Sequence, residues 1–96
     1  MLTINVTIEQ MRSMVRFSHI KLDDELEELK GACLIDLNIA GVNYIPDGDK
    51  LSYATLRLYL RWQENYNGEA ERYKLAYEAA KTAMSLASEY KEVPTP

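Results

Sequence analysis

The stretch that decides the fold is residues 69–90, EAERYKLAYEAAKTAMSLASEY. Its inward-facing positions recur in alternating steps of three and four residues, the spacing of one helix packed along another. The members of this seam are Ala70, Tyr73, Tyr77, Ala80, Met84 and Ala87. Asn67–Gly68 precedes the stretch, and Pro94 follows it. We therefore predict a helix over residues 69–90, the longest of the chain, with a non-helical tail over residues 93–96.

The preceding segment, residues 51–66, is predicted to be a helix with two separated apolar faces, because successive side chains are about 100° apart around a helix. One face holds Leu51, Ala54, Leu58 and Trp62, the other holds Tyr53, Leu56 and Leu60, and Arg57 and Arg61 lie on a flank between them. Such a helix is either sandwiched inside its own domain or shared with a neighbouring molecule. In a protein of four short helices the shared arrangement has weight. If Leu60 lies on the shared face, Leu60→Asp should disrupt assembly more than folding.

A further helix is predicted to begin at the acidic cluster that starts at Asp23, because negative charges stabilise the N-terminal end of a helix. Its core stripe consists of Leu22, Leu26, Leu29, Cys33, Leu37 and Ala40, and Gly41 ends it. Three apolar residues, Leu34, Ile35 and Ile39, fall outside this stripe and need another surface to cover them. The predicted subunit interface therefore comprises Leu34, Ile35, Ile39, Tyr53, Leu56 and Leu60.

The remaining segments complete an all-α fold. Thr7 and Gln10 have the spacing of a capping box, which predicts a helix over residues 8–16. Residues 1–6 alternate apolar and polar side chains but have no partner strand in the sequence, so they are predicted to form an extended arm. Turns are expected at residues 17–21 and 41–50. The prediction is one domain, residues 1–96: a small bundle of about four helices with a long C-terminal helix and an extended N-terminal arm.

The composition and charge of the chain disfavour several classes of function. The 96 residues carry a net charge of −4, which disfavours a grip on nucleic-acid phosphates. Arg57 and Arg61 are too few to make a basic recognition helix, so a helix-turn-helix DNA-binding domain is disfavoured as well. The single cysteine cannot form an intrachain disulfide, and no basic-then-apolar leader opens the sequence, so we expect an intracellular protein. Apolar runs of three or four residues are too short to span a membrane.

The sequence offers no catalytic, metal-binding or cofactor-binding set. His19 is the only histidine, and we interpret it as a surface or turn residue. Cys33 lies on a core stripe, where a thiol behaves as a small apolar group. The turn Asp47–Gly48–Asp49 resembles the start of a calcium loop, but Leu58 stands where that loop requires a bidentate glutamate. The acids after Asp23 are explained by helix capping. We therefore predict a protein that is not an enzyme and needs no metal or cofactor.

The order of these features resembles that of a known family. The stretch VTIEQMR at residues 6–12, DDEL at residues 23–26 opening an increasingly apolar helix, a loop with Pro46, and the aromatic-rich run from Leu51 to Trp62 are similar to the gp6-like head–tail connector family of tailed bacteriophages, also called phage DNA-packaging proteins. The resemblance covers residues 6–90. It rests on a pattern of helices and not on a catalytic motif.

This resemblance implies a structural virion protein, made in the bacterial host cytoplasm and located at the head–tail junction. It implies a homo-oligomeric, dodecamer-like ring under the portal protein that also contacts the next tail-completion protein. DNA would pass through the channel without specific binding. The alternative is a non-viral helical module for protein–protein interaction or regulation, such as an antitoxin-like protein.

Overall fold

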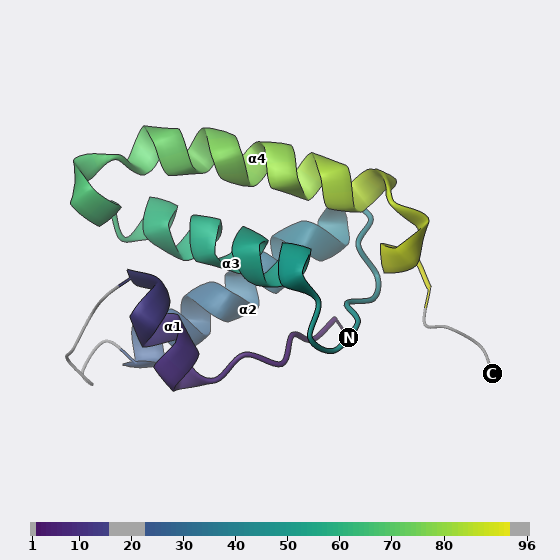
Figure 1. Cartoon of the computed structure of the whole chain (residues 1–96), viewed down its shortest axis with the longest axis horizontal. Helices are drawn as coiled ribbons and strands as arrows, with labels where there is room; N and C mark the ends of the chain where they lie inside the picture. The colour runs from purple at the N-terminus through teal and green to yellow at the C-terminus, as the bar shows by residue number, and fades with distance from the viewer. Residues whose placement is uncertain (1, 16–22, 93–96) are drawn as a thin grey trace.

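The computed structural model describes residues 2–15 and 23–92, which form four α-helices and two 3₁₀ turns and contain no strand. The helices are α1 (Ile8–Val15), α2 (Asp23–Ile39), α3 (Lys50–Gln63) and α4 (Ala70–Leu86), and the 3₁₀ turns are η2 (Tyr66–Gly68) and η3 (Ser88–Tyr90). The middle helix, α3, packs against α4 on one side and against α1 and α2 on the other (Figure 1). The predicted small all-α bundle is confirmed.

Local capping explains where α1 and α3 begin. The Gln10 backbone N–H donates to the Thr7 hydroxyl at 3.2 Å, and the Thr7 N–H donates to the Gln10 side-chain oxygen at 2.8 Å, so the predicted capping box is present. At α3, the Asp49 carboxylate accepts from the Ser52 N–H at 2.8 Å. The polar loop residues therefore set the first turns of both helices.

Two predicted helix ends were wrong. The helix expected to continue to Tyr66 ends at Gln63, because Asn65 takes a left-handed conformation with φ of 50°. The helix expected to continue to Tyr90 ends at Leu86, where the extended Ala87 turns the chain into η3. As a result α4 has 17 residues, the same as α2, and is not uniquely the longest helix.

The hydrophobic core lies between α3 and the helices that pack against it. Its fully buried side chains come from every helix and from η3: Met11, Leu26, Leu37, Leu56, Leu60, Tyr77, Met84 and Tyr90. Of the predicted seam of α4, Tyr73, Tyr77 and Met84 are buried, while the small residues Ala70 and Ala80 are half-buried. Leu26, Cys33 and Leu37 on the predicted stripe of α2 are buried as well. Helical periodicity therefore identified the core faces of α2 and α4 correctly.

The N-terminal arm, residues 2–7, has no regular secondary structure but packs onto this core. Leu2 and Val6 are both 7% exposed, Ile4 is half-buried, and Thr3 and Asn5 are exposed. The apolar and polar alternation noted in the sequence therefore separates an inner side of the arm from an outer side.

Two arginines link α1 to α2 and α3. Arg12 forms a two-pronged ion pair with Asp23, the first residue of α2. Arg61 of α3 donates from Nε to the Met14 carbonyl at 2.8 Å and lies over the Tyr66 ring. The predicted turn at residues 17–21 with His19, the stripe position Leu22 and the predicted tail at residues 93–96 lie outside the described residues.

Candidate assembly surfaces

An exposed apolar patch lies on the outer side of α2. Ile35 is 61% exposed and Ile39 is 79% exposed, one turn apart and opposite the buried Cys33 and Leu37. Leu34 is half-buried beside them and packs against the core. Leu34, Ile35 and Ile39, together with Leu2 of the arm, line a shallow hollow of about 440 Å³. This α2 patch is the part of the predicted interface that the structure leaves accessible.

Leu56 and Leu60, in contrast, were wrongly assigned to a shared face. They are 1% and 0% exposed, because α3 is the middle layer of its own domain and this side packs against α1 and α2. Tyr53 is half-buried at the edge of α3. The opposite apolar face, with Leu58 and Trp62, is half-buried and packs onto the core. Both apolar faces of α3 are therefore used inside the subunit.

A second exposed apolar surface was missed in the sequence. Leu75 is 66% exposed and Leu86 is 79% exposed on the outer side of α4, and Ala79 between them is exposed as well. Leu75 lies two residues from both Tyr73 and Tyr77, which places it about 160° around the helix from those seam residues. The signal was present in the periodicity, because Leu75 and Leu86 fall outside the seam just as Ile35 and Ile39 fall outside the stripe of α2.

A network of hydrogen bonds and an ion pair links α2 to α4. The Tyr77 hydroxyl donates to the Asp36 carboxylate at 2.7 Å, and Lys81 Nζ lies 3.1 Å from the same carboxylate. Burial raises the pKa of the Cys33 thiol to about 12 and also raises the pKa of Tyr77. Both groups are therefore protonated at neutral pH, and the network acts as a structural link between helices.

No group of three or more potential metal ligands occurs in residues 2–15 and 23–92. Over the same ranges, no helix is both long enough and apolar enough to serve as a membrane span.

Two carboxyl groups interact between α2 and the end of α3, at Glu25 and Glu64. Burial, together with the hydrogen bond to Glu25 and repulsion from it, raises the pKa of Glu64 to about 7 from an ordinary value of 4.5. Between these two pH values the folded chain holds a proton at Glu64 that the unfolded chain releases. The contribution of this pair to stability therefore falls as pH rises from about 4.5 to about 7.

We expect Glu64→Gln to be more stable than the wild type at pH 8 and nearly equal to it at pH 4.5, because the amide cannot ionise beside Glu25. Urea unfolding across this range measures the effect. Glu89→Gln, which removes an exposed acid in η3, serves as the matched control. Stability profiles for the wild type and Glu64→Gln that run parallel with pH would contradict the assignment.

Comparison with known proteins gives no relative: no family model, no curated protein and no solved structure matches the chain. Its function must therefore be argued from its surfaces.

Proposed function

We propose that this chain is the subunit of a homo-oligomeric ring, and more specifically a head–tail connector of a tailed bacteriophage. The observation that carries the proposal is the exposure of large apolar side chains on both outer layers of the bundle, at Ile35 and Ile39 on α2 and at Leu75 and Leu86 on α4. Exposed apolar patches typically mark protein–protein contacts.

The placement of these patches favours a ring. A head-to-tail contact joins two different surfaces, so that each subunit has one neighbour on each side, and such contacts close into a ring when the rotation permits. The α2 patch and the outer side of α4 are two different exposed surfaces, carried by two different helices of the bundle (Figure 1). The net charge of −4 is also compatible with a channel through which DNA passes without adhering.

The more specific proposal, a head–tail connector, is supported in addition by the sequence resemblance described above. In that role the portal protein and the next tail-completion protein are the partners on the two open sides of the ring, and the location is the head–tail junction of the virion. The runner-up function, a non-viral regulatory or interaction module, predicts a monomer or a closed dimer.

Ile39→Asp tests the role of the α2 patch. Because Ile39 is 79% exposed, we expect the free energy of unfolding to change by less than about 0.5 kcal/mol and association to weaken at least about tenfold. Light scattering on a size-exclusion column over a range of concentrations measures both the wild type and the variant. Ser13→Asp adds the same charge at an exposed site on α1, a helix that carries neither patch, and should assemble like the wild type.

The same measurement separates the two functions. A high-order species for the wild type, visible as rings by electron microscopy, supports the connector. A strict dimer at all concentrations would exclude the connector and favour the regulatory module.

A further inference from the structure

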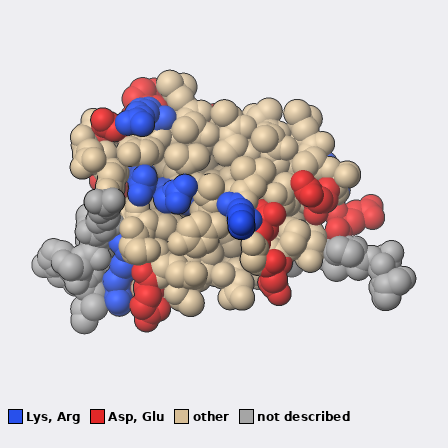
Figure 2. Space-filling model, in the orientation of Figure 1, with Lys and Arg blue, Asp and Glu red and all other residues tan. Residues whose placement is uncertain are grey.

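The solvent-facing side of α3 is basic. Its sequence, KLSYATLRLYLRWQ, has three basic residues and no acidic one. Figure 2 shows basic groups in a row across the middle of this face, over α3 and among mostly uncharged side chains. Arg61 is engaged by the Met14 carbonyl and the Tyr66 ring. Lys50 and Arg57, in contrast, have no ion-pair partner among the described residues.

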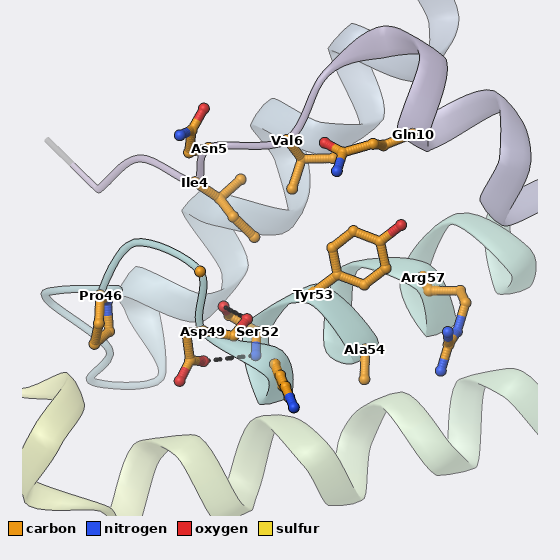
Figure 3. Close-up of a pocket in the computed structure, with 12 residues that line it drawn as sticks. Ile4, Asn5, Val6, Gln10, Pro46, Asp49, Ser52, Tyr53, Ala54 and Arg57 are labelled. Atoms are coloured by element: carbon orange, nitrogen blue, oxygen red, sulfur yellow. Dashed lines mark hydrogen bonds between the residues drawn. The ribbon is translucent and has the colours of Figure 1, made fainter.

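Lys50 and Arg57 border a pocket of about 410 Å³ between the N-terminal arm, the loop before α3 and α3 itself (Figure 3). Its apolar lining comes from Ile4, Val6, Pro46, Tyr53 and Ala54. In the close-up, the Ile4 and Val6 side chains extend from the arm toward α3, and the Tyr53 ring lies between the two elements. The pocket combines an apolar interior with two cations, which suits an apolar side chain flanked by carboxylates.

Asp49, the acidic residue of the pocket lining, is already committed to the fold. Its carboxylate accepts hydrogen bonds from the Ser52 N–H and from the Tyr90 hydroxyl, at 2.8 Å and 2.9 Å. Lys50 and Arg57 therefore remain the charged groups of the lining that are available to a partner.

The outer side of α4 carries a complementary set of side chains, an apolar residue between two carboxylates. Glu71, Leu75 and Glu78 lie on one face of the helix, since they are spaced by four and then three residues. Leu75 is 66% exposed and Glu71 is exposed. Glu78 is half-buried and forms an ion pair with Lys81 at 3.0 Å through one carboxylate oxygen, and its other carboxylate oxygen has no partner among the described residues. Glu71 and Glu78 are seven residues apart, about 10.5 Å along the helix, and so are Lys50 and Arg57. Both pairs of charges have an apolar centre between them.

We propose that the pocket on α3 receives Leu75 of a second copy of this chain, with Glu71 and Glu78 of that copy paired with Lys50 and Arg57. Leu75 faces away from α3 in its own subunit, so one copy cannot fill its own pocket. The contact joins two different surfaces and is therefore head-to-tail. It rests on the proposed ring and names one part of its head-to-tail contact, whereas the α2 patch, tested separately by Ile39→Asp, is another part of the assembly surface.

Charge reversal tests the contact. The variant K50E/R57E and the variant E71K/E78K should each fold, as judged by helical circular dichroism, and each should associate at least about a hundredfold more weakly than the wild type. An equimolar mixture of the two variants should recover association to within about tenfold of the wild type, because each reversed surface then meets a reversed partner. Sedimentation velocity at low and high salt measures all four samples, and association should weaken with salt.

Disulfide trapping locates the contact independently. Ala54→Cys combined with Leu75→Cys should give a ladder of covalent oligomers under mild oxidation. Ala54→Cys combined with Glu89→Cys, whose second site is exposed but lies outside the proposed contact, should give at most a covalent dimer. The native Cys33 is buried and its raised pKa of about 12 keeps it protonated and unreactive.

The other outcomes of these experiments also decide between the proposed contact and its alternatives. A wild-type chain that stays monomeric at 1 mM, or a mixture that fails to associate, would overturn the contact. Rings that form despite both reversals would overturn the contact and leave the proposed connector intact, whereas strict dimers would overturn the connector itself. Salt-sensitive DNA binding that K50E/R57E abolishes, without any loss of assembly, would assign the basic face to nucleic acid instead.

Discussion

Leu60→Asp is expected to unfold the protein. Leu60 is 0% exposed in the middle layer, and the substitution replaces its apolar contacts with a carboxylate that has no buried partner. Loss of the apolar contacts and burial of an unpaired charge together cost more than about 4 kcal/mol, a large part of the 5–15 kcal/mol that stabilises a typical domain. Far-UV circular dichroism should show loss of helix at 25 °C.

This result reverses the expectation drawn from the two apolar faces of the third helix, which placed Leu60 on a shared surface. Leu86→Asp is the matched control, because Leu86 is 79% exposed on α4 and the same substitution there should leave helical content and urea midpoint nearly unchanged. A folded Leu60→Asp monomer with normal helical content would restore the original interpretation.

Tyr90→Ala is expected to destabilise the chain by about 3–5 kcal/mol, comparable to other large aromatic truncations in a core. Tyr90 is 2% exposed and its hydroxyl donates to the Asp49 carboxylate, which in turn caps α3. The Tyr90 carbonyl also accepts from the N–H groups of Asn43 and Tyr44, at 2.8 Å and 3.1 Å. The Tyr90 backbone and hydroxyl thus contact both ends of the long loop between α2 and α3. The substitution keeps the backbone bonds and removes the ring and the hydroxyl, and urea unfolding measures the effect.

Tyr90→Phe separates the two contributions. It keeps the ring and removes only the hydroxyl bonds to Asp49, so a smaller loss of about 1–3 kcal/mol is expected. Equal losses in Tyr90→Phe and Tyr90→Ala would mean that the hydroxyl, and not the ring, provides the link.

Some of the candidate surfaces could be predicted from the sequence, and others could not. Ile35 and Ile39 could be identified as exposed, because α2 has one clear apolar stripe and both residues lie on the opposite side of the helix. The pocket on α3 could not be identified, because it is formed by the arm, the loop and the helix together. The basic residues Lys50 and Arg57 become noteworthy only once their position beside that pocket is known.

The sequence by itself determined the local properties of the chain. The capping box at Thr7, the acidic helix start at Asp23 and the breaks near Gly41 and Gly68 indicate where helices form. The spacing of three and four residues indicates which face of α2 and α4 is apolar. All of these signals depend on neighbours within one or two turns. Tertiary structure decided which layer each helix occupies. Two apolar faces on α3 fit a shared helix and a central helix equally well, and only packing against α4 on one side and α1 and α2 on the other showed that α3 is central. The same long-range contacts explain the early end of α4, because the chain must turn at Ala87 to bury Tyr90.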